Sequence, residues 1–442
     1  GHLQARTPAL DALARSGLRF QHAYCANPIC GPARASMWTG MYTHHHRVTA
    51  NEIPWPVGTT SIGDSFRAAG YHTAAVGKMH FADANCHGFD YRLDFNDWYQ
   101  YLGPKAKLYA DEVGRAFPGD GHPQIGSLWH GIDPWKGLYE PDGREGWTHV
   151  GRTSKLPEAD HFDSFVARES IEYLKRYASR GPFFLVTSFI KPHQPFMPAE
   201  RFAKMYRAGD MRLPESWGKM DPATTPKFIQ RRIRENPLTP ELLDPAKALQ
   251  RIASYYGSLA QMDDCAGSVL RALKETGLEE DTIVVYTSDH GELLGEHSLW
   301  QKFVFYESSV SVPLIFRVPG ITAAGGTCEV PVSHVQLAPT LAELCGVKPL
   351  ASFDGESLLP LLREPACTMD TTVHAHYDMG TPNRKAMVRH GDWKYCHYIN
   401  DIPELFNLRE DPQEMRNLAA VPAARGKLDE LRSMIIGLEM RT

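Results

Sequence analysis

The sequence predicts an α/β fold with a doubly wound, mostly parallel sheet and a smaller α+β subdomain at its C-terminal end. Apolar runs bounded by turn residues are typical of buried parallel strands, and they occur at 73–76, 183–190, 282–287 and 313–318. Helical patterns lie between or beside these runs, at 59–69, 161–177, 246–275 and 333–345. Strands that alternate with helices predict a sheet whose site lies at the C-terminal strand edge.

The remaining elements follow from local signals. Residues 7–14 read as a short capped helix that opens the chain. Two stretches, about 83–160 and 207–245, are rich in Gly, Pro and aromatic residues and lack periodicity, as binding loops or lids often do. After about residue 370 a hairpin at 387–395 and a closing helix at 428–438 are expected. We therefore expect a main domain over 1–370 and a subdomain over 371–442.

Composition excludes several classes of function. The chain has 442 residues, is 43% hydrophobic and carries a formal charge of −5 with dispersed basic residues, which argues against nucleic acid or anionic membrane as a partner. No apolar run approaches the roughly 20 residues that span a bilayer. The 8 cysteines show no zinc-like spacing and favour, weakly, a reducing compartment. Cytoplasmic and periplasmic locations both stay open.

The segment around Cys30 is the most informative. It reads Cys-Gly-Pro-Ala-Arg-Ala-Ser-Met-Trp-Thr-Gly over 30–40, and a helix is expected from Arg34 onward. Cys30 would then precede a helix N-terminus, which favours an anion, and Arg34 would add a guanidinium suited to oxyanions. The plain alternative is that Cys30 is a small buried hydrophobe.

Other polar residues follow the predicted strands. Asp289 and His290 come directly after one strand, and an adjacent carboxylate and imidazole suit a metal ion, although Asp289 alone could simply cap a turn. Lys78 and His80 follow another strand and share a side of an extended segment. His193 lies between prolines past a third strand, where an ordinary loop histidine is the alternative.

The order Cys-x-Pro-x-Arg, four residues, then Thr-Gly resembles the maturation motif of the type I sulfatases, which depend on formylglycine and belong to the alkaline-phosphatase superfamily. Further segments resemble motifs of that family in the same order, at 7–14, 77–80 (Gly-Lys-Met-His), 191–196 (Lys-Pro-His-Gln-Pro-Phe), 288–292 (Ser-Asp-His-Gly-Glu), 299–302 (Leu-Trp-Gln-Lys), 334–346 and 403–418. The resemblance implies an alkaline-phosphatase-like fold and a sulfuric ester hydrolase with 1–370 as its catalytic domain.

The resemblance also implies a nucleophile and a metal. Cys30 is expected to be oxidised by a formylglycine-generating enzyme, and one hydroxyl of the hydrated aldehyde attacks sulfur. The metal ligands carried over are Asp289, His290 and the modified Cys30, with Ca²⁺ as first choice and Mn²⁺ or Mg²⁺ as alternatives. Unmodified Cys30 should give little turnover, because a sulfated thiol has no second hydroxyl through which to expel sulfate.

The charge and proton roles come from the same resemblance. Arg34, Lys78 and Lys302 are expected to neutralise charge on the sulfuryl oxygens. His193, alone or with Lys302, protonates the leaving oxygen, and His80 helps the second hydroxyl lose its proton. His297, His334 and the run His44-His45-His46 match no ligand position and are expected to be structural or to lie at the substrate edge.

One departure concerns the start of the chain. In the family a first strand ends in two acidic residues that supply further metal ligands, and it would lie before Thr7, where this sequence has no such strand. We expect that strand to precede the sequence in the natural protein, because a sheet without a central strand would not form as the rest of the sequence encodes it.

Several alternatives stay open. A phosphonate monoester or phosphodiester hydrolase of the same superfamily is the closest, because such enzymes also use formylglycine and an Asp-His pair. A non-catalytic protein that binds a sulfated ligand is a more remote one. The substrate is expected to be a small organic or carbohydrate sulfate, and oligomeric state is not predicted. Four tryptophans of the long loop could stack on a sugar or aryl ring or cage a cation, or fill a core: Trp98, Trp129, Trp135 and Trp147.

Overall fold

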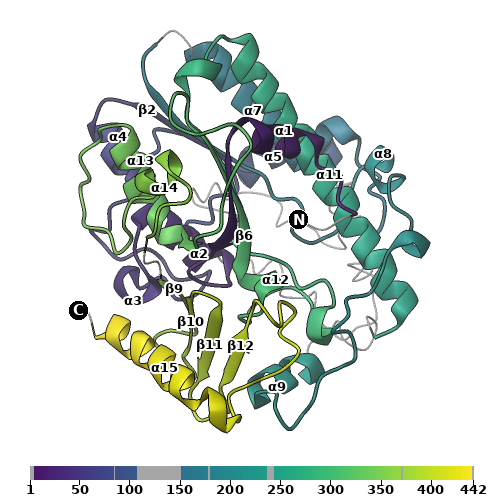
Figure 1. Ribbon diagram of the computed structural model, residues 1–442. Helices are drawn as coiled ribbons and strands as arrows, with labels where there is room; N and C mark the ends of the chain where they lie inside the picture. The colour runs from purple at the N-terminus through teal and green to yellow at the C-terminus, as the bar shows by residue number, and fades with distance from the viewer. Residues whose placement is uncertain are drawn as a thin grey trace. The chain divides into compact units, whose positions relative to one another are not determined.

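Three β-sheets organise the chain in this computed structural model, which describes residues 4–83, 85–106, 151–177, 180–235, 243–369 and 372–440 (Figure 1). The chain divides into two compact units, and the residues of each unit contact mainly one another. Unit 1 comprises 1–13, 66–213 and 240–282, and unit 2 comprises 14–65, 214–239 and 283–442. The two units are described separately below.

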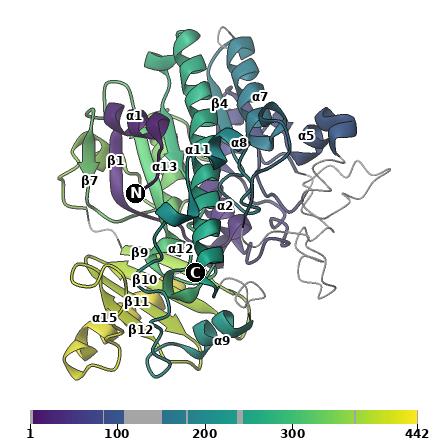
Figure 2. The ribbon, with the colours of Figure 1, turned by 90° about the vertical axis from the view of Figure 1, so that its right-hand side faces the viewer.

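The sheet of unit 1 is parallel throughout. Its central strand β2 (His72–Gly77) pairs with β3 (Tyr91–Leu93) on one side and β4 (Phe183–Ser188) on the other. Helix α7 (Phe162–Tyr177) packs on β2 and β4 and lies beside the long helix α11 (Pro245–Glu275), as Figures 1 and 2 show. Val76, Phe162 and Val166 lie in the core between them.

The larger sheet of unit 2 is mixed. Its order is β5 (Val284–Thr287), β6 (Ser311–Arg317), β1 (Leu18–Tyr24) and β7 (Gly326–Cys328), and β8 (Val332–Ser333) also pairs with β1. Strand β6 runs antiparallel to both neighbours, whereas β7 and β8 run parallel to β1. The α/β fold class is confirmed, with this antiparallel strand inside a sheet predicted to be mostly parallel.

The C-terminal part of unit 2 is an antiparallel meander with one covering helix. Strands β9 (Thr372–Tyr377), β10 (Lys385–His390), β11 (Trp393–Tyr398) and β12 (Glu404–Asn407) pair in sequence order. Helix α15 (Arg425–Glu439) lies on β10 and β11, with Leu428, Leu431 and Ile435 buried against Val388 and Leu405. This is the predicted α+β subdomain; the boundary at 370 stays a prediction.

The other helices are shorter. The α-helices are α1 (Pro8–Ser16), α2 (Cys30–Thr39), α3 (Thr43–His46), α4 (Ile62–Ala68), α5 (Phe95–Leu102), α8 (Glu200–Ala203), α9 (Lys227–Glu235), α12 (Glu307–Val310), α13 (Leu337–Leu344) and α14 (Leu359–Arg363). The 3-10 helices are η1 (Gly103–Lys105), η2 (Glu158–Asp160), η3 (Ala208–Asp210), η4 (Glu279–Asp281), η5 (Glu296–Ser298), η6 (His334–Gln336) and η7 (Pro422–Ala424).

The predicted long loops are more structured than their composition indicated. The first contains β3 and α5, and the second contains α9. Trp98 of α5 is 1% exposed and its indole N–H donates to the Asp160 carbonyl at 2.8 Å, so this tryptophan fills a core. The predicted loop segment 107–150, with Trp129, Trp135 and Trp147, lies outside the described residues.

Two strands are half-buried at the edge of their own sheets. In the described part of the chain β4 pairs only with β2, and β5 pairs only with β6. All residues of both strands are intermediate in exposure, although most are apolar. An edge strand presents unpaired backbone N–H and C=O groups, with which a further strand can pair.

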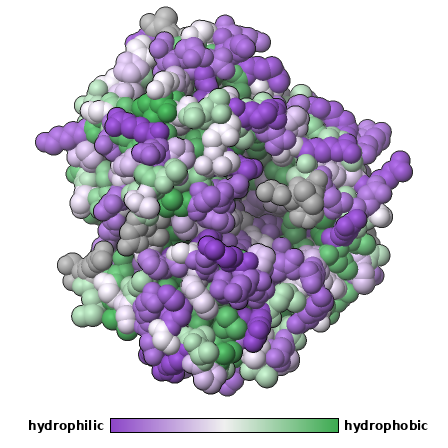
Figure 3. Space-filling model, viewed as in Figure 1, coloured by the Kyte–Doolittle hydropathy of each residue, from purple (hydrophilic) through white to green (hydrophobic). Residues whose placement is uncertain are grey.

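On the face shown in Figure 3, hydrophilic side chains are widely spread and hydrophobic ones form small separate groups. No helix of the described residues is both long and apolar enough to cross a membrane. All 8 cysteines are free thiols.

Histidines gather around Tyr42 in unit 2. The His44 ring stacks on Tyr42 with centroids 6.2 Å apart, and His374 and His376 meet the same ring edge-on at 5.8 and 5.9 Å. Burial lowers the pKa of His376 well below the usual range. His44 of this run thus packs against Tyr42 and against His376 of β9.

The hydrogen bonds of His46 fix its neutral form. The Val48 N–H donates to His46 Nδ1 at 3.0 Å, so the proton of the neutral ring lies on Nε2, 3.0 Å from Ser36 Oγ. A second proton on Nδ1 would face the Val48 N–H. Burial accordingly lowers the pKa of His46 to about 3.

The free energy of unfolding should fall as the pH drops from 7 to 5. An unfolded histidine takes up a proton near pH 6.5 while folded His46 stays neutral, so the stability it contributes is complete above pH 6.5 and is lost progressively toward pH 3. For His46 alone the loss at pH 5 is about 2 kcal/mol. Urea unfolding of wild type and His46→Gln at several pH values measures it.

Gln can donate to Ser36 and accept from Val48 without titrating, so His46→Gln should flatten the pH dependence. The exposed His72, changed to Gln, is the control and should leave the slope as in wild type. Identical slopes for wild type and His46→Gln would contradict this account.

Candidate active site

Helix α2 begins at Cys30 itself, four residues before the predicted start at Arg34. Pro32 does not prevent this, because the N–H that proline lacks would have no partner in the first turn of a helix. The preceding Ile29 gives no side-chain cap. Asn51 takes that place: its Oδ1 accepts the Gly31 N–H at 2.9 Å. Cys30 therefore lies in the first turn, buried at 1% exposure.

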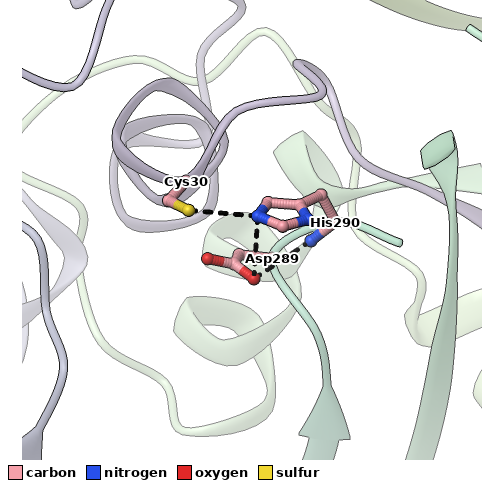
Figure 4. A group of neighbouring side chains, drawn as sticks. All are labelled: Cys30, Asp289 and His290. Carbon is pink, nitrogen blue, oxygen red and sulfur yellow. Dashed lines mark hydrogen bonds and ion pairs between the residues drawn. The ribbon is translucent and has the colours of Figure 1, made fainter. Parts of the chain in front are cut away.

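His290 directs a ring nitrogen at this cysteine. Cys30 Sγ lies 3.0 Å from His290 Nε2 (Figure 4). His290 Nδ1 lies 2.8 Å from the Gly291 carbonyl oxygen, which only accepts, so Nδ1 carries the proton of the neutral ring. The lone pair of Nε2 then faces Cys30. A nitrogen with this tautomer is suited to accept a proton or bind a metal.

Arg34 and Asp289 form a second link one helical turn along α2. Arg34 Nε donates to Asp289 Oδ2 at 2.8 Å, with side chains 8% and 12% exposed. The other oxygen, Asp289 Oδ1, accepts the backbone N–H of His290 at 3.2 Å. Both residues after β5 are thus oriented toward the first turns of α2.

The donor set suits a divalent cation. One ligand atom from each of Cys30, Asp289 and His290 lies within 4.8 Å of the others, and within the described ranges this is the one such group found. An anionic carboxylate and an imidazole lone pair are donors that such ions accept. The residues present fit the expected metal, although they do not select Ca²⁺ over Mn²⁺ or Mg²⁺.

Lys302 lies in the same unit as these residues. Its side chain is buried at 7% exposure, and Nζ lies 5.6 Å from the centroid of the Phe303 ring. A lysine is seldom buried this deeply on a surface loop. Its burial fits a role beyond that of an ordinary surface charge.

The other three predicted residues gather at one edge of the sheet in unit 1. Lys78 and His80 follow β2, His193 follows β4, and these strands run parallel with Gly77 opposite Ser188. Lys78 and His80 are buried, and His80 adopts φ +60°.

His193 Nδ1 lies 2.7 Å from the Gln194 carbonyl oxygen. That carbonyl accepts the proton of Nδ1, so the lone pair of the neutral ring lies on Nε2. The roles carried over for Lys78, His80 and His193 stay predictions.

Two further histidines are structural in their surroundings. His334 is fully buried, and burial lowers its pKa to about 4. The His297 ring stacks on Tyr306 with centroids 3.8 Å apart, and burial lowers its pKa to about 4.

Sequence reasoning missed Asn51. A Cβ placed on Gly31 would lie 3.1 Å from both Asn51 Cα and Oδ1, so this segment passes directly over the first turn of α2. Asparagine in a turn is common, and nothing in the sequence around it indicates the tertiary contact. Only the three-dimensional structure reveals the contact between Asn51 and the first turn of α2.

Comparison with known proteins agrees with the geometry. The family model "Sulfatase" matches residues 1–347, and "N-sulphoglucosamine sulphohydrolase, C-terminal" matches 295–440. Choline-sulfatase of Rhizobium meliloti is 30% identical over 96% of this chain and 79% of its own length. An arylsulfatase of Clostridium perfringens is 30% identical over 97% and 88%.

Solved structures share the fold. The phosphonate monoester hydrolase of Silicibacter pomeroyi superposes with a TM-score of 0.82 at 24% identity, covering 99% of this chain and 91% of its own. BT4656, solved in complex with its substrate D-glucosamine-2-N,6-O-disulfate, has a TM-score of 0.73 at 23% identity, covering 99% and 93%. The predicted enzyme class, a sulfuric ester hydrolase of the alkaline-phosphatase superfamily, is confirmed, and the chain belongs to the sulfatase family.

Proposed function

We propose that the protein hydrolyses the sulfate ester of a small organic or carbohydrate substrate with a nucleophile derived from Cys30. The observation that carries this proposal is the position of Cys30 in the first turn of α2, with Sγ 3.0 Å from His290 Nε2 and within 4.8 Å of an Asp289 oxygen. A helix N-terminus and a basic neighbour, Arg34, favour an anionic substrate at this point.

The motif around Cys30 supports conversion to formylglycine by a formylglycine-generating enzyme. The hydrated aldehyde has two hydroxyl groups, one to attack sulfur and one through which the adduct collapses. A divalent cation held by Asp289, His290 and the converted Cys30 would act as a Lewis acid on that hydroxyl and on the sulfuryl oxygens.

The chain's own residues orient the site and balance its charge. Arg34 holds Asp289 in place through Nε. Arg34 and Lys302 are assigned to neutralising charge on the sulfuryl oxygens. In unit 1, Lys78 is assigned to charge neutralisation, His193 to protonation of the leaving oxygen, and His80 to proton removal in the second step.

Phosphonate monoester hydrolysis is the second candidate. A relative named multifunctional alkaline phosphatase superfamily protein PehA, from Trinickia caryophylli, is 29% identical over 95% of this chain, and the fold matches a phosphonate monoester hydrolase. Sulfate monoesters and phosphodiesters both carry one negative charge, so charge alone does not separate them.

Parallel assays on 4-nitrophenyl sulfate and a phenyl phosphonate monoester test the proposal. The sulfate should be the better substrate, and Cys30→Ala should lower turnover of both by at least about 1,000-fold, because loss of a nucleophile removes covalent catalysis. Cys345→Ala, a partly exposed cysteine at the end of α13, is the matched control and should keep wild-type rates. Preference for the phosphonate would establish the second candidate, and full activity of Cys30→Ala would refute both.

Asn51→Ala should destabilise the protein by about 1 kcal/mol and lower kcat, because the Gly31 N–H loses its acceptor beside the nucleophile. Asn51→Asp keeps an acceptor, so it should recover stability, yet its negative charge should raise KM for an anionic substrate. Urea unfolding and steady-state kinetics separate the two effects. Wild-type kinetics for both variants would show that Asn51 does not position Cys30.

A further inference from the structure

We propose that Glu292 is a positioning residue that ties the backbone at Lys302 to the metal-binding turn Asp289-His290. The inference rests on the proposed function, in which Lys302 acts on the substrate. It concerns the chain between 290 and 303, which leaves the turn after β5 and returns beside it within unit 2.

The returning segment is held by backbone pairing. The Leu293 N–H donates to the Gln301 carbonyl and the Gly295 N–H donates to the Leu299 carbonyl, both at 2.8 Å. Lys302 therefore follows directly on a residue that is paired with Leu293. Lys302 belongs to no helix or strand of the structure. Its position therefore depends on this pairing between Leu293 and Gln301.

The backbone at Lys302 is not self-supporting. Gln301 adopts φ +72° and Phe303 adopts φ +84°, so both neighbours of Lys302 lie in a region that residues with a Cβ disfavour. Such conformations persist only where surrounding contacts enforce them, and they concentrate at functional sites. Lys302 therefore needs outside contacts to keep its position.

Glu292 supplies one of these contacts at Gln301. Its Oε1 accepts the Gln301 N–H at 2.6 Å, while the carbonyl of Gln301 accepts the Leu293 N–H. Gln301 is thereby held at both of its backbone polar groups, by two consecutive residues of the outgoing segment. A hydrogen bond to a charged acceptor is stronger than one between neutral groups.

The other end of this link is fixed at the metal-binding turn. Gly291 precedes Glu292, and its N–H donates to the Ser309 carbonyl at 2.8 Å. A Cβ on Gly291 would come within 2.0 Å of the Ser308 carbonyl oxygen, so this backbone passes too close to Ser308 for any residue but glycine. His290 Nδ1 in turn contacts the Gly291 carbonyl at 2.8 Å. The carboxylate of Glu292 thus connects the turn at Asp289-His290 to the strained backbone of Gln301, next to Lys302.

Glu296 provides a matched control in the same segment. Its carboxylate is hydrogen-bonded to Ser308 Oγ, and Gln301 is not among its partners. Both residues are glutamates that accept one hydrogen bond within this loop. Of these two glutamates only Glu292 holds the residue next to Lys302, so of the two only its loss should act through Lys302.

A double-mutant cycle tests the proposal in the metal-loaded, formylglycine-containing enzyme. Glu292→Ala should lower kcat by about 10- to 100-fold, because a displacement of Lys302 by about 1 Å costs that much activity. Glu292→Gln keeps a hydrogen-bond acceptor and should recover most of the activity. Glu292→Ala added to Lys302→Ala should have no further effect, since the carboxylate acts through the lysine. Gln301→Gly, which adopts φ +72° without strain, should partly rescue Glu292→Ala.

Glu296→Gln should reduce thermal stability without changing kcat, and it should combine additively with Lys302→Ala. Independent effects of Glu292→Ala and Lys302→Ala would overturn the positioning role. So would wild-type kcat in Glu292→Ala alongside an impaired Lys302→Ala. Full activity of Lys302→Ala would instead refute the proposed role of the lysine itself. If Glu292→Ala does not fold, the Glu292→Gln variant and its cycle with Lys302→Ala decide the question.

Discussion

Two buried contacts between α2 and the turn after β5 hold the candidate site together. Cys30 meets His290 and Arg34 meets Asp289, so residues one helical turn apart bind consecutive residues at a strand end. Side chains four apart on a helix share a face, which is why both contacts can form at once. The site depends on this match between helical and extended spacing.

The sheet of unit 2 brings these two elements together. Strand β1 leads into α2, β5 leads into Asp289, and β6 pairs with both strands between them. A shift of either strand by one residue would reverse which side chains face α2. The pairing of these strands therefore sets the distance between Cys30 and His290. Asn51 and Glu292 then accept hydrogen bonds from the Gly31 and Gln301 N–H groups, which fixes the segments that carry Cys30 and Lys302.

Most of the strands and helices were predictable from local sequence patterns. The four apolar runs are strands, and the long amphipathic segments are helices close to their predicted ends, since burial dictates both periodicities. That Cys30 lies beside Asp289 and His290 was implied by the resemblance to the type I sulfatases, whereas the ion pair between Arg34 and Asp289 was not predicted. Strand β1 was missed because Arg19, Gln21 and His22 interrupt its apolar pattern.

Other features are set by tertiary contacts that leave no trace in local sequence. Helix α2 begins at Cys30, where Asn51 caps it from a turn 20 residues along the chain, whereas the local sequence predicted a start at Arg34. Nothing in the sequence distinguishes Glu292 from other acidic residues. Its role is indicated only by the structure, in which Gln301 has a positive φ. Contacts between a side chain and a remote backbone group leave no periodic pattern in the sequence, so only the three-dimensional structure reveals them.

The most direct test of the central claim is mass spectrometry of the peptide that contains Cys30, from protein coexpressed with a formylglycine-generating enzyme. The account predicts that this peptide carries the aldehyde of formylglycine in place of the thiol. A thiol that persists in folded protein under these conditions would contradict the account, because the nucleophile it requires would never form.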